Sequence, residues 1–200
     1  MLQTLMDGAI TKASPTSVPN LLTYGRIVAV PAFAAVFLLL EGDQRRWIAL
    51  TIFVAACFTD WLDGYLARMW QQQSMLGRML DPIADKLLVG AALILLVQDG
   101  TISRVSVWAA LIILSREILV SGLREFLAEL NVKVHVSRLA KWKTTLQMVA
   151  LGVLLAGPAG ERQIAGVMAV GTALLWVAAL LTIWTGGGYL TAAVRSTLDR

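Results

Sequence analysis

The sequence is poor in charged residues, and this scarcity decides its class. Charged side chains make up 15% of the 200 residues, whereas hydrophobic side chains make up 58%. The mean hydropathy is +0.71. A water-soluble domain carries about a quarter charged residues. We therefore predict an all-α integral membrane protein that folds as one domain, and we exclude a soluble globular enzyme.

Cysteine and histidine are almost absent, with one residue of each. Cys57 lies within an apolar run, so an intramolecular disulfide is excluded and a packing role is expected. His135 lies among polar residues of an expected loop, where a solvated side chain is commoner than a metal ligand. The first fourteen residues lack a continuous apolar core, so no cleavable signal peptide is expected.

Apolar runs separated by polar segments predict six transmembrane helices. Their expected ranges are 27–40, 47–70, 82–97, 105–130, 140–157 and 163–184. Pro82 is expected in the first turn of the third helix. Residues 41–46 are expected to form a hairpin loop, and the glycines at 186–188 to break or kink the chain. The domain prediction assigns 1–19 to an N-terminal segment suited to a short interfacial helix, 20–194 to the membrane domain, and 195–200 to a C-terminal tail.

Polarity along the helices predicts a cavity and its orientation. Five of the six expected helices are apolar for about half a span and polar for the rest, which is typical of walls around a water-accessible cavity. The side that holds both termini carries twelve of the seventeen Lys and Arg residues, and the other side carries four. By the positive-inside rule, the termini and the cavity face the cytoplasm, in a bacterial inner membrane.

Four aspartates lie within the 26 residues from 60 to 85. Asp60 and Asp63 are three residues apart, and Asp81 and Asp85 are four apart, so each pair shares one helix face. The polar residues 71–74 are expected to form the turn that folds one helix back on the other, and the four carboxylates then converge. Carboxylates inside an apolar segment need a cation to remain ionised, and hard divalent ions prefer oxygen ligands. The sequence therefore predicts a site for Mg²⁺ or Mn²⁺.

The spacing of these residues also resembles a family signature. The segment that begins at Asp60 and ends at Asp85 reads D-x2-D-G-x2-A-R-x8-G-x3-D-x3-D. It is similar to the signature of the CDP-alcohol phosphotransferases, integral membrane enzymes that build phospholipid head groups. The segments PNLLT-x2-R, REILVSGLREF and KWKTT resemble the branch that makes phosphatidylglycerophosphate. Solvated helix caps would explain one aspartate, but not four at this spacing.

The resemblance implies a reaction and a set of roles. Phosphatidyl transfer from CDP-diacylglycerol to sn-glycerol 3-phosphate would release CMP, with two divalent ions, a homodimer and contact with membrane lipids; no nucleic-acid partner is expected. The implied metal ligands are Asp60, Asp63, Asp81 and Asp85. Asp85 is also the implied general base. The implied contacts with CDP-diacylglycerol are Asn20, Thr23, Arg26, Asp63, Gly64, Ala67, Arg68 and Gly77.

A second polar cluster follows the aspartates along the chain. Arg116 and Arg124 are eight residues apart, close to one helix face, and Lys141, Lys143 and Thr144 open the next helix. These five residues are candidates for binding the phosphate of glycerol phosphate, because Arg offers a planar fork and Lys a point charge. Snorkelling explains charges at helix ends, but Arg116 lies several residues inside an apolar span.

Other functions remain open on the sequence. The same catalytic motif would serve another acceptor, such as serine, inositol phosphate, or phosphatidylglycerol as in cardiolipin synthesis. A membrane prenyltransferase also uses aspartate pairs and Mg²⁺, but it has two separated motifs and more helices. A divalent-cation transporter would explain aspartates inside the membrane, but not Gly64, Ala67, Arg68 and Gly77 at fixed spacing.

Overall fold

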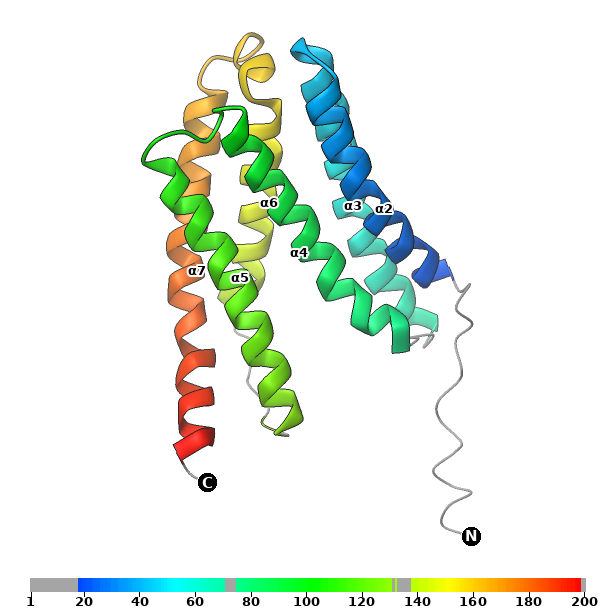
Figure 1. The fold of residues 1–200 in the computed structure, drawn as a ribbon, viewed down its shortest axis with the longest axis vertical. Helices are drawn as coiled ribbons and strands as arrows, with labels where there is room; N and C mark the ends of the chain where they lie inside the picture. The colour runs from blue at the N-terminus through cyan, green and yellow to red at the C-terminus, as the bar shows by residue number, and fades with distance from the viewer. Residues whose placement is uncertain (1–17, 71–74, 131, 133–137, 199–200) are drawn as a thin grey trace.

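The computed structural model describes residues 18–70, 75–130, 132 and 138–198, and every regular element in these ranges is an α-helix. The helices are α2 (Val18–Leu39), α3 (Gly42–Trp70), α4 (Met75–Gln98), α5 (Ser106–Glu129), α6 (Arg138–Glu161) and α7 (Val167–Leu198). They run up and down as a bundle, and the start of α2 and the end of α7 point toward the same end of it, called here the end of the termini (Figure 1). The all-α prediction is confirmed. The proposed interfacial helix, the turn at 71–74 and His135 lie outside the described residues.

Four of the described helices contain an apolar segment that could cross a membrane. Within the described residues, four segments are long and apolar enough to cross a membrane: Leu21–Leu39, Gly42–Tyr65, Ser106–Ala128 and Val167–Gly188. α4 and α6 have 24 residues each, which is enough to span about 30 Å, but both carry charged residues close together in their first halves. A membrane protein is therefore confirmed, and six membrane spans stay a prediction.

Several expected boundaries are wrong. α3 begins at Gly42, so residues 42–46 are helical and do not form a hairpin loop. α4 begins at Met75, which places Pro82 inside the helix and not in its first turn. α7 continues without a break through the glycines at 186–188 to Leu198. Glycine and proline stop helices in water, but membrane helices tolerate them because neighbouring groups satisfy or cover the backbone.

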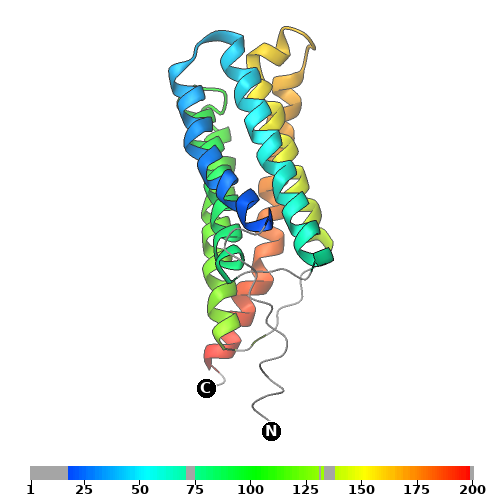
Figure 2. The same cartoon turned by 90° about the vertical axis from the view of Figure 1, so that its right-hand side faces the viewer.

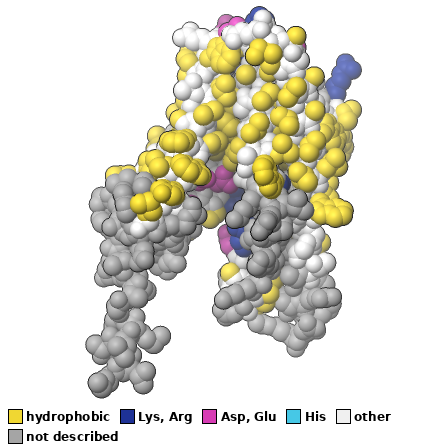
Figure 3. Space-filling model, turned by 180° about the vertical axis from the view of Figure 1, so that it is seen from behind, with side chains coloured by type: hydrophobic (Ala, Val, Ile, Leu, Met, Phe, Trp, Pro, Cys, Tyr) yellow, Lys and Arg dark blue, Asp and Glu magenta, His cyan; other side chains and the backbone are white. Residues whose placement is uncertain are grey.

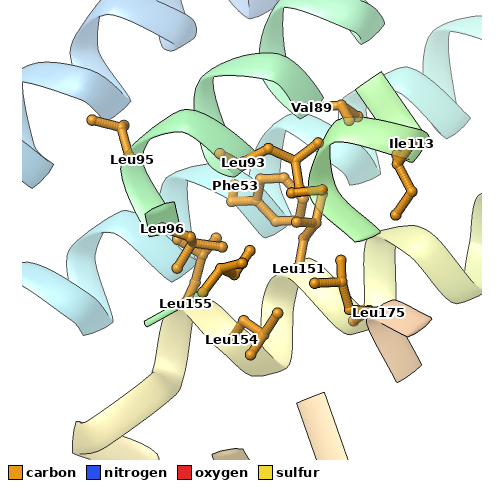
Figure 4. Packing of buried hydrophobic residues seen from close by; sticks show 14 of the residues in the cluster. Phe53, Val89, Leu93, Leu95, Leu96, Ile113, Leu151, Leu154, Leu155 and Leu175 are labelled. Atoms are coloured by element: carbon orange, nitrogen blue, oxygen red, sulfur yellow. The ribbon is translucent and has the colours of Figure 1, made fainter. Parts of the chain in front are cut away.

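The apolar core occupies the half of the bundle farthest from the termini. Buried side chains from all six described helices meet there, among them Phe53, Leu93, Ile113, Leu151 and Leu175 (Figure 4). Each lies in the part of its helix nearer to the loops that join α4 to α5 and α6 to α7. From that end, α4 and α5 diverge toward the end that carries the termini (Figure 1). The packed core thus leaves the other half of the bundle open for polar residues.

A buried arginine ties the packed end together. Arg46 donates from Nη2 to Asp99 and, over 2.8 Å, to Thr101 Oγ1, and from Nη1 to the carbonyl of Leu154 over 3.4 Å. It therefore joins α3, the connection after α4, and α6. Gly157 kinks α6 with a φ of +44°, and a Cβ there would lie 2.5 Å from Arg46 Nη1. The sequence suggested only loop charges at Arg45 and Arg46.

We expect Arg46→Met to lower the free energy of unfolding by about 3 kcal/mol, because it removes the main partner of the buried Asp99 carboxylate and leaves only Arg45, 3.4 Å away, to pair with it. Arg162→Met is the matched control, since Arg162 pairs with Asp43 on the exposed surface. The control should change the free energy of unfolding by less than about 1 kcal/mol. Equilibrium unfolding in mixed micelles measures both variants, and equal effects would contradict a structural role for the Arg46 cluster.

Candidate functional site

The four aspartates of the motif lie on the halves of α3 and α4 nearest the termini. Asp60 and Asp63 are in the last three turns of α3, and Asp81 and Asp85 are in the first three turns of α4. Asp63 is buried and the others are half-buried. Asp85 lies within electrostatic reach of Asp60, and Asp60 within reach of Asp81. The structure therefore brings the two pairs together, as the spacing predicts.

α2 supplies a cation and a hydroxyl group to these carboxylates. Arg26 Nη2 donates to Asp63 Oδ2, and Arg26 Nη1 lies 2.5 Å from Asp60 Oδ1 without the alignment of a hydrogen bond. Thr23 Oγ1 donates to Asp81 Oδ1 over 2.6 Å. Both α2 residues are buried. The sequence predicted them as contacts of the nucleotide, and the structure makes them partners of the motif's aspartates.

The donor set suits a hard divalent cation in its chemistry. Within the described residues, no three Asp, Glu, His or Cys side chains gather closely enough to hold a metal ion. The Arg26 guanidinium supplies the positive charge between Asp60 and Asp63 instead. Arg26 Nη1 is not aligned for a hydrogen bond to Asp60, although it lies close to that carboxylate. Carboxylate oxygens are the ligands that Mg²⁺ and Mn²⁺ prefer, so a metal ion at this site stays a prediction. In the arrangement described here, Arg26 holds Asp60 and Asp63 together.

The remaining motif residues are placed only in part. Gly64 follows Asp63 on α3, and a Cβ built on it would meet no atom within 4 Å, so a ligand has room to approach the backbone. Gly77 is buried in the first turn of α4. The side chains of three other predicted nucleotide contacts lie outside the described residues: Asn20, Ala67 and Arg68.

A second charged cluster joins α5 to its neighbours. Lys143 of α6 is buried, and its Nζ donates to Glu117 Oε1 of α5. Arg116 Nη1 lies 3.7 Å from the same oxygen, and Arg116 Nε donates to the carbonyl of Thr182 on α7 over 3.2 Å. Glu117 is also within electrostatic reach of Asp85. The two polar clusters are therefore close enough for their charges to interact.

The predicted phosphate pocket is assembled in part. Arg116 and Lys143 converge on Glu117, as described above. Arg124 and Thr144 are exposed, and the side chain of Lys141 lies outside the described residues. No role was predicted for Glu117 from the sequence. Its position inside an apolar helix could have predicted an ion pair, because an acidic residue there is costly in a membrane and almost always has a partner.

Comparison with known proteins identifies the family. The family model for CDP-alcohol phosphatidyltransferase matches residues 16–184. The chain belongs to the CDP-alcohol phosphatidyltransferase family. The resemblance carried by the aspartate motif is therefore confirmed.

Relatives of this family resemble the chain over nearly its whole length, and each is named CDP-diacylglycerol–glycerol-3-phosphate 3-phosphatidyltransferase. The protein of Rickettsia bellii is 46% identical over 176 residues, which cover 88% of this chain and 94% of the relative. That of Haemophilus influenzae is 44% identical, over 92% of this chain and 96% of the relative. That of Escherichia coli K12 is 43% identical, over 92% of this chain and 98% of the relative.

The described surface of this phosphatidyltransferase-family chain is mostly apolar. Hydrophobic side chains cover most of it in Figure 3, and acidic and basic side chains appear at the top of the view and in the hollow near its centre. Exposed apolar surface of this extent suits a helix bundle that lies in a membrane.

The ion pair between Glu117 and Lys143 should couple the stabilities of their variants. Glu117→Gln and Lys143→Met each leave a buried or half-buried charge unpaired, so the double variant should be more stable than the sum of the single effects predicts. We expect a coupling free energy of about 0.5–3 kcal/mol in a double-mutant cycle of unfolding. Glu125→Gln, on the exposed face of α5, replaces Glu117→Gln in the control cycle, which should be additive. Additivity in both cycles would contradict the pair.

Proposed function

We propose that the protein transfers the phosphatidyl group of CDP-diacylglycerol to sn-glycerol 3-phosphate, giving phosphatidylglycerophosphate and CMP. The observation that carries this proposal is the identity of 43–46% with relatives of that name over at least 88% of the chain. The site agrees with it, because a carboxylate cluster and buried cations lie close enough to interact.

The chemistry is a displacement at phosphorus. The 1-hydroxyl oxygen of glycerol phosphate forms a bond to the phosphorus that carries diacylglycerol, and the bond from that phosphorus to the CMP oxygen breaks. Asp85 accepts the proton of the hydroxyl group, since it is a half-buried carboxylate within electrostatic reach of both Asp60 and Glu117. Arg26 keeps Asp60 and Asp63 together, and Thr23 orients Asp81. Asn20, Gly64, Ala67, Arg68 and Gly77 complete the proposed site for the nucleotide.

Two divalent ions, Mg²⁺ or Mn²⁺, are part of the proposal, and Asp60, Asp63, Asp81 and Asp85 would hold them. Bound there, the ions neutralise charge on the pyrophosphate and on the group in transfer. The phosphate of the acceptor binds to Arg116 and Lys143, and Arg124, Lys141 and Thr144 are the further candidates for this contact. Charge-assisted contacts of this kind are stronger than neutral hydrogen bonds.

Transfer from labelled CDP-diacylglycerol to a panel of acceptors tests the proposed reaction. We expect the purified protein to form labelled phosphatidylglycerophosphate with sn-glycerol 3-phosphate and to release CMP. Serine, inositol phosphate and phosphatidylglycerol serve as the rival acceptors. Transfer to one of these in place of glycerol phosphate would overturn the acceptor assignment, and metal uptake into vesicles without any transfer would favour a transporter.

Loss of one motif carboxylate should remove both activity and metal binding. We expect Asp81→Asn to reduce transfer by at least about a hundredfold and to reduce the number of Mn²⁺ ions bound, counted by electron paramagnetic resonance. Asp43→Asn is the control, because Asp43 lies on the surface at the other end of the bundle. Full activity of the unchanged protein after thorough chelation would contradict the metal proposal.

The orientation is proposed together with the reaction, as is a homodimer. The positive-inside rule puts the site and both termini on the cytoplasmic side of a bacterial inner membrane. In a Cys57→Ala background, a cysteine at Gln72 or Lys133 should react with an impermeant reagent only from the cytoplasm, and one at Gly42 only from the opposite side. Labelling of positions 42 and 72 from the same side would contradict this topology. Native mass spectrometry in detergent tests the dimer.

A further inference from the structure

Two buried side chains near the charged cluster have oxygens without partners. Gln147 on α6 is 2% exposed and Thr182 on α7 is fully buried. Gln147 Oε1 and Thr182 Oγ1 have no hydrogen-bond partner among the described residues. Buried polar atoms are almost always hydrogen-bonded, because an unpaired one pays its full desolvation cost. Two such atoms in one region indicate that something else binds there.

Gln147 lies close to Lys143 on α6. It follows Lys143 by one turn on the buried face of α6, so the two side chains share that face. Its neighbour Met148 places its sulfur 3.9 Å from Cys57 Sγ, and Cys57 precedes Asp60 by about one turn of α3. Gln147 is therefore about one turn deeper in the bundle than Lys143 and the first aspartate.

Thr182 lies at the level of Lys143. α6 and α7 are antiparallel neighbours (Figure 1), and a Cβ on Gly171 of α7 would lie 2.9 Å from Leu154 Cδ2 of α6. Thr182 follows Gly171 by the same number of residues as separates Lys143 from Leu154. Arg116 supports this register, because it donates to the Thr182 carbonyl while the adjacent Glu117 binds Lys143.

We propose that Gln147 and Thr182 bind the C2 hydroxyl group of the glycerol acceptor and thereby select for it. This inference rests on the proposed function. With the acceptor phosphate at Lys143 and Arg116, and the C1 hydroxyl at Asp85, the C2 hydroxyl is the polar group that still needs partners. A hydroxyl group both donates and accepts, so it pairs with the Gln147 amide in either orientation and with the Thr182 hydroxyl.

An acceptor without the C2 hydroxyl tests this directly. 3-Hydroxypropyl phosphate keeps the phosphate and the reacting hydroxyl group but leaves both side chains unpaired. We expect the unchanged protein to prefer sn-glycerol 3-phosphate by about 10- to 100-fold in kcat/KM. Gln147→Met and Thr182→Val should each bring this ratio closer to one, chiefly by loss of activity with glycerol phosphate.

Matched controls separate recognition from general damage. Gln163→Met changes an exposed glutamine near the start of α7, and Thr172→Val removes a hydroxyl whose partner is the Met168 carbonyl. Both controls should keep the ratio of the unchanged protein. If Gln147→Met does not fold, the ratio of kcat/KM for the two acceptors in Thr182→Val tests the inference.

Two results would overturn the inference. The first is equal use of the two acceptors by the unchanged protein, which needs no variant. The second is an equal loss with both acceptors in Gln147→Met and Thr182→Val, the result expected if the two oxygens bind only a structural water. Neither result affects the proposed reaction, whereas failure of the unchanged protein to transfer to either acceptor would refute the proposed function itself.

Discussion

The structure depends on ion pairs that join charged side chains of different helices inside the bundle. An ionised group without a partner is costly in an apolar bundle. Arg26 of α2 therefore meets Asp60 and Asp63 of α3, and Lys143 of α6 meets Glu117 of α5. Because each pair crosses from one helix to another, the need to neutralise charge also determines which helices adjoin in the polar half.

This constraint divides the bundle into two halves with different tasks. At one end, apolar side chains of the six described helices pack together (Figure 4), and the Arg46 cluster joins three segments. Toward the other end, α4 and α5 separate (Figure 1), and the ion pairs of Arg26 and Lys143 lie there. Some acidic and basic side chains are visible in a hollow of the surface (Figure 3). A rigid end can hold catalytic groups in register while the open end admits substrates, which is the arrangement that phosphoryl transfer requires.

Predictions based on helical periodicity succeeded for the aspartate motif. Asp60 and Asp63 share a face, as do Asp81 and Asp85, because spacings of three and four residues are properties of one helix. Boundaries drawn from turn-forming residues were less accurate. α3 starts at Gly42 and α7 passes through the glycines at 186–188, although glycine has a low helix propensity. Gly186 lets the Arg116 side chain lie close to α7.

The sequence by itself determined the membrane class, the helical architecture and the family, because composition, periodicity and motif spacing are local properties. Only the tertiary structure decided which charges meet. Thr23 and Asp81 are 58 residues apart, Arg46 and Asp99 are 53 apart, and Glu117 and Lys143 are 26 apart. No local pattern encodes such pairs, since they form only when separate helices pack. The unpartnered oxygens of Gln147 and Thr182 are visible for the same reason only in the folded chain, where burial shows which polar atoms still need a partner.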